Sequence, residues 1–310
     1  MKRPEPSRVK ILRRGVFRWY HRHQRELVWR TTRDPYEILV SEVMLQQTQV
    51  SRVQEKLPIF LRQFPTLRSL AHAPKARVIR AWQGMGYNNR AVRLRDMAGC
   101  VVTDHGGQLP SEVTLLEELP GIGPYTAHAV ACFAFGKRVP LVDVNICRVL
   151  SRYFRRMSTT TSLRSEKEIW ELATTILPRD AYTWNQALMD LGATTCTAKR
   201  PRCTDCPLTS TCSSRNLQLK TTEPLSKTKK TEARYDGLPH RIWRGRIVEI
   251  LRTVDDHGTL SILSLGKKLK PAFKETEVPW LSRIVSTLER DGLAHTIRTG
   301  STTRVSLTQG

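Results

Sequence analysis

Apolar residues recur every three to four positions through the first two thirds of the chain. Residues 35–64 and 76–102 show this spacing clearly, and turns marked by proline or glycine separate such segments. This period places apolar side chains on one face of an α-helix, whereas a half-buried strand alternates at every second residue. No alternating run occurs between residues 15 and 215. The pattern therefore predicts a helical domain over residues 1–215.

The pattern changes after this domain. Residues 216–237 are polar, rich in lysine and threonine and without periodicity, which is typical of a linker. Residues 238–310 carry three helical segments, then two alternating runs joined by a Thr-Gly-Ser turn, which indicates a β-hairpin. This order predicts a winged-helix-like domain, whose third helix commonly enters the DNA major groove. Winged helices also bind proteins, so both kinds of partner stay open.

Charge narrows the choice of partner. The 310 residues carry a formal net charge of +23, which favours a polyanion, with nucleic acid as the first candidate. The alternative is a generally basic surface that binds nothing in particular. No apolar run approaches the roughly 18 residues of a membrane helix, and the N-terminus lacks the apolar core of a signal peptide. We expect a cytoplasmic protein without a membrane partner.

The cysteines are distributed unevenly. Three of the seven are scattered, and four lie within one short basic stretch: Cys196, Cys203, Cys206 and Cys212. Such usage does not suggest a disulfide framework, and gathered thiolates suit an iron–sulfur cluster or zinc. Zinc sites more often pair two C-x2-C knuckles, whereas this stretch has one. The spacing favours the iron–sulfur cluster and leaves zinc as the alternative.

A glycine turn is a candidate phosphate site. Gly121 and Gly123 lie between an apolar helix end and a new helix that Pro124 opens. Backbone amides exposed beside a helix N-terminus attract phosphate, although a glycine connector between helices often means only a tight turn.

Two acids stand among apolar residues. Glu42 lies within an apolar helical stretch, and Asp143 precedes a helix. A carboxyl group in such surroundings is either a satisfied cap or surface group, or a catalytic group tuned by desolvation. The capping alternative fits Asp143 well.

Several motifs together resemble the helix-hairpin-helix DNA glycosylases with an iron–sulfur loop, and most closely the MutY adenine glycosylases. The resemblance spans residues 17–215. Its motifs are LVWRTTRDPYEILVSEVMLQQTQV, GMGYNNRA, LPGIGPYTAHAV, LVDVN and NQALMDLGATTCTAKRPRCTDCPLTSTC.

The resemblance implies a mainly α fold: a two-lobed helix-hairpin-helix glycosylase domain with a cluster loop at residues 196–212, followed by the winged-helix-like domain. It implies that the four clustered cysteines hold a four-iron four-sulfur (4Fe-4S) cluster. Lys199, Arg200 and Arg202 match a loop that meets DNA phosphates. The cluster would then order a cationic loop in advance, which lowers the entropic cost of binding DNA.

The resemblance also implies catalytic roles. Glu42 matches an acid that protonates N7 of adenine, and Asp143 matches a carboxylate that stabilises the oxocarbenium-like sugar. Tyr125 stands where bifunctional relatives such as endonuclease III carry a Schiff-base lysine, so we expect a monofunctional enzyme that leaves an abasic site. The implied DNA contacts are Gln46, Gln47, Tyr87, Gly121, Gly123 and Asn145.

Some positions depart from the family pattern. Val144 replaces a common glycine, Asn88 and Asn89 follow Tyr87 in place of an aromatic and a small residue, and the C-terminal domain differs from the usual lesion reader. We expect a base-excision-repair enzyme, a monomer on mismatched or damaged double-stranded DNA, that removes adenine opposite guanine or 8-oxoguanine. The alternatives are removal of thymine or uracil from T:G or U:G mismatches, and an inactive DNA-binding protein on the same scaffold.

Overall fold

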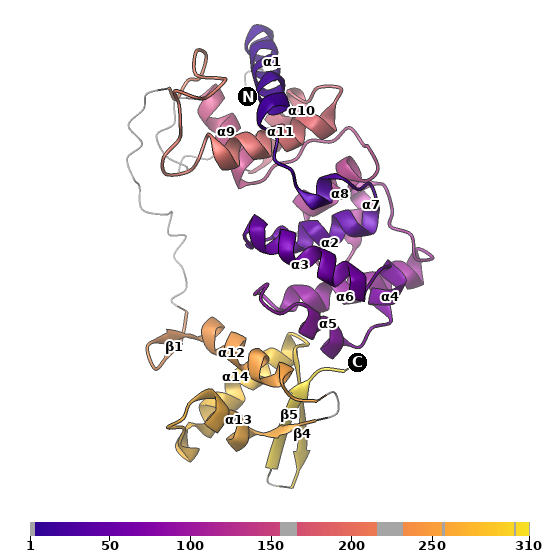
Figure 1. The fold of residues 1–310 in the computed structure, drawn as a ribbon, viewed down its shortest axis with the longest axis vertical. Helices are drawn as coiled ribbons and strands as arrows, with labels where there is room; N and C mark the ends of the chain where they lie inside the picture. The colour runs from indigo at the N-terminus through magenta and orange to yellow at the C-terminus, as the bar shows by residue number, and fades with distance from the viewer. Residues whose placement is uncertain (1–3, 156–165, 216–231, 256–257, 301, 310) are drawn as a thin grey trace. The chain divides into compact units, whose positions relative to one another are not determined.

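The computed structural model describes residues 4–155, 166–215, 232–255, 258–300 and 302–309. The chain divides into two compact units. The first contains residues 1–39, 111–117 and 122–227, and the second contains residues 40–110, 118–121 and 228–310. Figure 1 shows the elements of both units along the chain.

The first unit is helical. Helix α11 (Ala181–Thr194) contacts both α1 (Pro6–His23) and α9 (Val144–Phe154). Helix α1 turns one apolar face inward because Leu12, Val16 and Trp19 follow one another at intervals of four and three. The unit also contains η1 (Val28–Arg30), α8 (Pro124–Phe133), α10 (Glu166–Thr175) and most of α7 (Val113–Glu118).

The second unit begins within α2 (Pro35–Leu45). Its other helices before residue 110 are α3 (Val50–Gln63), α4 (Leu67–Ala71), α5 (Lys75–Ala81) and α6 (Asn89–Asp104). Helix α6 contacts both α4 and α5, and the rings of Phe60 and Trp82 meet edge to face at 5.7 Å. The described residues up to 215 contain no strand, which confirms the helical prediction.

The C-terminal part of the second unit has the winged-helix order. It contains α12 (His240–Arg252), β3 (Leu260–Ser261), α13 (Ile262–Leu269), η3 (Glu275–Glu277), α14 (Val278–Arg290), β4 (Ala294–Thr299) and β5 (Thr302–Leu307). The antiparallel sheet has the order β3-β5-β4, with Val305 opposite Leu260 on one side and Thr296 on the other. The three helices and the hairpin were predicted, whereas the two-residue β3 is too short to leave an alternating pattern.

The winged helix shares its core with α5 and α6. Ala76, Ile79 and Val92 belong to the same buried apolar cluster as Trp243 and Leu281. The packing is supported by a buried arginine of α12 (8% exposed), whose guanidinium donates to neighbouring backbone and side-chain oxygens. The C-terminal elements therefore pack directly against α5 and α6.

The predicted linker, residues 216–237, lies outside the described residues as far as 231. The part that is described contains β1 (Arg234–Tyr235), which pairs with β2 (Leu238–Pro239) through a turn in which Asp236 and Gly237 have positive φ. Among the described residues, no helix is long and apolar enough to cross a membrane.

Arg252 is the first position to test. Its Nε donates to the Ile79 carbonyl at 3.0 Å and its Nη2 donates to Asn88 Oδ1 at 2.9 Å. Arg252→Met keeps most of the volume but leaves both acceptors without a donor, at a cost of about 2 kcal/mol. We expect hydrogen exchange at α5 and α12 to accelerate by roughly 30-fold, the factor that corresponds to this energy.

The matched control is Arg283→Met. Arg283 is an exposed arginine of α14, where such a change costs little. Equal protection of α5 and α12 in the two variants would contradict the role given to Arg252.

Candidate functional site

Glu42 is a buried acid of α2, in the second unit. The helix begins after Asp34, whose Oδ1 accepts the Tyr36 amide at 2.7 Å. Glu42 is 4% exposed, and its helix neighbours Ile38 and Val43 are also buried. The Glu42 side chain is therefore largely removed from solvent, and a charged group is costly in such a position.

Arg90 ties the end of α2 to the turn that contains Tyr87. Its guanidinium donates to the carbonyls of Val43 and Gln46 at 2.8 and 2.6 Å, and to that of Met85 at 2.9 Å. The Met44 and Gly86 carbonyls and the Thr48 hydroxyl also accept from it. Carbonyls at a helix C-terminus lack partners within the helix, so one side chain satisfies this end and fixes its distance from the turn.

The two segments that Arg90 joins expose the predicted DNA-contact residues. Gln47 and Tyr87 have φ angles of 55° and 44°, in the left-handed region that ordinary residues rarely adopt. Tyr87 is 55% exposed, Gln47 is exposed and Gln46 is half-buried. Burial lowers the pKa of Arg90 to about 10, which still leaves it charged at neutral pH, with its guanidinium 5.8 Å from the Tyr87 ring centre.

The predicted glycine turn joins α7 to α8. Gly121 has φ of 80°, in the left-handed region that favours glycine, whereas a Cβ there would make only an ordinary contact with the Arg93 side chain. Gly123 is the N-cap residue of α8, and a Cβ on it would meet nothing within 4 Å. The first amides of α8 therefore open onto space into which an anion could fit.

Asp143 caps α9 in the first unit. Its Oδ1 accepts the Ile146 amide at 2.7 Å, and its Oδ2 accepts Asn145 Nδ2 at 2.8 Å. Burial raises the pKa of Asp143, and these hydrogen bonds offset the increase only in part. Arg148 donates to Asn145 Oδ1 at 2.8 Å, which orients the amide. Asp143 is thus a helix cap, and the cap holds its carboxylate in one position.

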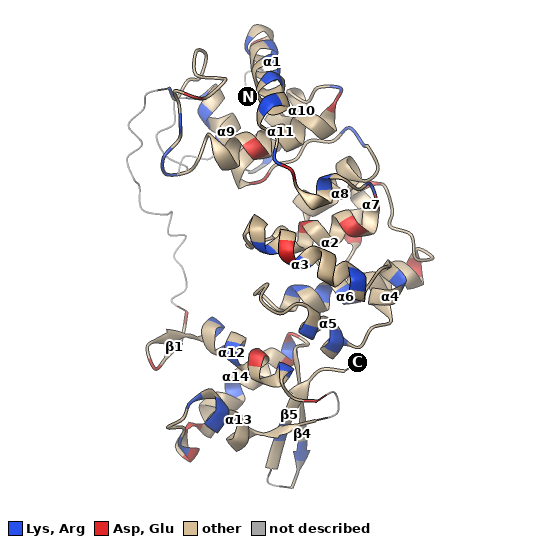
Figure 2. Ribbon diagram, in the orientation of Figure 1, with Lys and Arg blue, Asp and Glu red and all other residues tan. Residues whose placement is uncertain are grey.

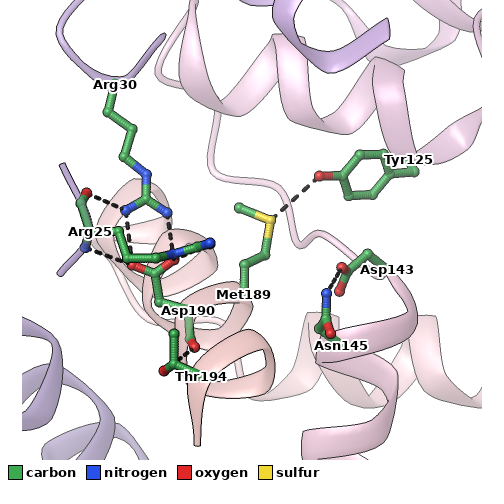
Figure 3. A network of polar contacts seen from close by, with 8 residues as sticks. All are labelled: Arg25, Arg30, Tyr125, Asp143, Asn145, Met189, Asp190 and Thr194. Atoms are coloured by element: carbon green, nitrogen blue, oxygen red, sulfur yellow. Dashed lines mark hydrogen bonds and ion pairs between the residues drawn. The ribbon is translucent and has the colours of Figure 1, made fainter. Parts of the chain in front are cut away.

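Tyr125 lies on α8, and its hydroxyl points toward Met189 Sδ at 3.4 Å, whereas Asp143 is held by Asn145 (Figure 3). Met189 is followed on α11 by Asp190, which is fully buried and bound by Arg25 and Arg30. Burial alone would raise the pKa of Asp190, but the bonds and charges of the two arginines outweigh it and lower this pKa.

Sequence reasoning did not single out Arg90 or Asp190. Each left the same weak signal, a charged residue within an apolar helical face. Arg90 is in phase with Leu94 and Met97, and Asp190 follows Ala187 by three positions.

The four clustered cysteines line one small cavity of about 40 Å3, together with Arg152. Burial, together with the neighbouring cysteine sulfurs, raises the pKa of Cys206 to about 12. Arg152 is 7% exposed and donates from Nη1 to Cys196 Sγ at 3.4 Å. No group of three or more His, Cys, Asp or Glu in the described part of the chain has an arrangement that could hold a metal ion.

Hydrogen bonds from two arginines to backbone carbonyls hold the basic loop beside the cysteines. Arg152 donates to the Thr197 and Ala198 carbonyls at 2.7 and 3.0 Å, and Arg202 donates to the Thr194 carbonyl at 2.9 Å. Lys199, Arg200 and Arg202 are exposed. Lys and Arg also cover helices of both units, from α1 to α12 and α13 (Figure 2).

These features agree with comparisons to known proteins. Residues 40–174 match the model of the HhH-GPD superfamily base excision DNA repair proteins. An adenine DNA glycosylase of Mycobacterium tuberculosis is 38% identical over 257 residues, which cover 81% of this chain and 83% of that protein. One of Mycolicibacterium smegmatis is 40% identical over 237 residues, 76% and 78% of the two chains.

A solved structure agrees as well. A thermostable thymine-DNA glycosylase superposes with a TM-score of 0.64 at 33% identity, and the match covers 67% of this chain and 97% of that one. Together with the buried Glu42, the glycine turn and the cysteine loop, the comparisons establish that this chain belongs to the adenine DNA glycosylase family within the HhH-GPD superfamily of base excision DNA repair proteins.

Proposed function

We propose that this DNA glycosylase hydrolyses the N-glycosidic bond of adenine mispaired with guanine or 8-oxoguanine. One observation carries the proposal: Glu42, 4% exposed, lies on the helix whose end Arg90 ties to the turn that presents Tyr87. A buried acid is thereby linked to an exposed aromatic side chain that can stack on a base, as extrusion of a base from the duplex requires.

Glu42 acts as the general acid in this proposal. In its protonated form this buried carboxyl group can donate its proton to N7 of adenine and turn the base into a leaving group. Burial raises the pKa of Asp143, but hydrogen bonds from Ile146 and Asn145 favour its carboxylate and hold it in place. Its negative charge stabilises the positive charge that develops on the sugar.

Tyr125 makes the enzyme monofunctional. A phenol cannot form the Schiff base through which an amine would cleave the strand, and the Tyr125 hydroxyl is directed at Met189. The product is therefore an abasic site in an intact strand.

DNA is held by two kinds of contact in this proposal. Gln46, Gln47 and Tyr87 enter the base stack or line the pocket. The α8 N-terminus at Gly123, the turn at Gly121, the side chain of Asn145 and the basic loop with Lys199, Arg200 and Arg202 bind the strand and its phosphates. Residues 1–215 form the glycosylase domain, residues 216–237 the linker and residues 238–310 the winged helix.

We propose a 4Fe-4S cluster as the cofactor. The residues fit in chemistry: four thiols face one cavity, and a buried arginine beside Cys196 supplies positive charge for an anionic, thiolate-bound group. Cys196, Cys203, Cys206 and Cys212 would hold it, and its contribution is structural, because it orders the loop that carries Lys199 and Arg200. Zinc on the same thiolates is the competing assignment.

Thymine or uracil excision is the second candidate. It is favoured by the likeness to a thymine-DNA glycosylase and by Val144, which is 78% exposed where adenine enzymes commonly have glycine. An inactive DNA-binding scaffold is the third, and the presence of both carboxylates weighs against it.

Single-turnover assays on duplexes with A opposite 8-oxoguanine, A opposite G and T opposite G test the first two candidates. We expect alkali-dependent cleavage at adenine. Glu42→Gln removes the donated proton and should slow base release by roughly 10²- to 10⁴-fold, with mismatch affinity unchanged. Glu37→Gln, on the same helix, is the control with normal rates.

Cleavage at thymine would replace the first candidate with the second. A loss of affinity in Glu42→Gln that matches its loss of rate would contradict the acid role of Glu42.

Asn145→Ala tests the carboxylate role of Asp143. The variant loses a hydrogen bond that favours the carboxylate, so the pKa of Asp143 rises further above its ordinary value. Because base release needs the ionised form, the acid limb of the single-turnover rate should move to higher pH. Thr194→Ala, whose hydroxyl donates to the Asp190 carbonyl within α11, should leave this limb in place. An unshifted limb in Asn145→Ala would exclude Asp143 as the group that titrates there.

Metal analysis of the purified protein tests the cofactor. We expect a brown protein with absorption at about 400 nm and about four iron atoms per chain. Cys206→Ser should lose iron and bind DNA more weakly. Cys100→Ser, outside the cavity, should retain both. A colourless protein that contains zinc would refute the cluster.

A further inference from the structure

A broad open groove of about 1080 Å3 lies within the second unit, between the Tyr87 turn and the winged helix. Gln47, Gly86 and Tyr87 line one side, and residues of α12 and α13 line the other. The groove therefore begins at the side chains proposed to contact the extruded base and continues along elements that the proposed chemistry does not use.

The winged-helix side of the groove is cationic. Its basic side chains are Arg241, Arg244, Arg246 and Lys268. Arg241 is paired with Glu232 and Arg244 with Asp291, while Glu249 of the same groove is paired with Arg252. Arg246 is exposed with its guanidinium 5.0 Å from the Trp243 ring centre, so it is partly ordered before any ligand arrives.

Both sides of the groove leave room for close approach of a ligand. A Cβ at Gly86 or at Gly245 would meet nothing within 4 Å. From Arg241 to Arg246, α12 rises about 7.5 Å, and one strand of a duplex carries about two phosphates over that length. Positive side chains spread over this length fit a nucleic-acid strand better than a compact anion.

The two sides are held together by a bond at a position where the sequence departs from its family. Asn88, which directly follows Tyr87, accepts from Arg252 of α12 at 2.9 Å. Gln83 donates to Glu249 of the same helix at 2.9 Å. The turn that presents Tyr87 and the cationic helix are therefore parts of one preformed surface.

We infer that this groove binds the sugar-phosphate backbone of the DNA beside the extruded base, through α12 and α13 of the winged helix. The inference rests on the proposed function, which brings DNA to Tyr87. It makes the first helix of the winged helix, not the third, the principal DNA contact. The third helix, α14, and the hairpin carry their own exposed arginines, Arg283 and Arg298, and form the competing surface.

The test compares two double variants of the full chain. Arg246→Gln with Lys268→Gln removes two groove cations, and Arg283→Gln with Arg298→Gln removes two from the competing surface. Affinity for a 30-base-pair duplex with A opposite 8-oxoguanine is measured by fluorescence anisotropy over a salt series, since phosphate contacts contribute about 0.9 each to the salt slope.

We expect the Arg246→Gln/Lys268→Gln variant, the groove pair, to make the slope of log affinity against log salt concentration shallower by about 1.8. It should also weaken binding by more than about 10-fold at low salt. Its single-turnover rate at saturating protein should stay within about twofold of the original, because the groove contacts backbone and not the reacting base. The competing pair should behave like the unmodified protein.

Three results would overturn the inference: an unchanged slope in the groove pair, a shallower slope only in the competing pair, or equal weakening by both. Failure of the proposed function looks different. If the unmodified protein releases no base while the groove variant still shows the shallower slope, the proposed enzyme activity is refuted and the groove assignment stands.

Discussion

One buried guanidinium determines the geometry of the second unit. Arg90 donates to five carbonyl oxygens, at the end of α2 and in the turn before Tyr87, and to one threonine hydroxyl. Burying a charged group is costly unless it is hydrogen-bonded, and both terminal nitrogens of Arg90 donate to these segments, so a shift of either segment would carry a large penalty. The left-handed conformations of Gln47 and Tyr87 are held by this network, which offsets their local strain.

The two proposed catalytic carboxyl groups show how position sets chemistry. Glu42 lies inside an apolar helix, whereas Asp143 lies at a helix start, where backbone and amide donors surround it. The hydrogen bonds at the helix start favour the Asp143 carboxylate and offset part of the rise in pKa that burial causes. The cap that the sequence offered as an alternative to catalysis for Asp143 is what orients the carboxylate.

Periodicity predicted most of the fold, because helices such as α1, α3 and α14 bury one apolar face. It could not show that Ile79 and Val92 share a core with Trp243, since a hydrophobic face does not specify its partner. Local motifs made Glu42, Asp143 and the cysteines candidates for the site, and their roles stay predictions. The roles of Arg90 and of the groove along α12 could not be predicted, because both depend on contacts between segments far apart in the sequence.

The shared core has a consequence for dissecting this protein. Removing residues 238–310 would uncover Ala76, Ile79 and Val92, an apolar surface that water now does not reach. A shortened chain would therefore tend to self-associate. Changes in its properties would arise from the newly exposed apolar surface as well as from the loss of the winged helix. Polar substitutions on α5 and α6 would have to accompany such a truncation before the helical layer could be studied by itself.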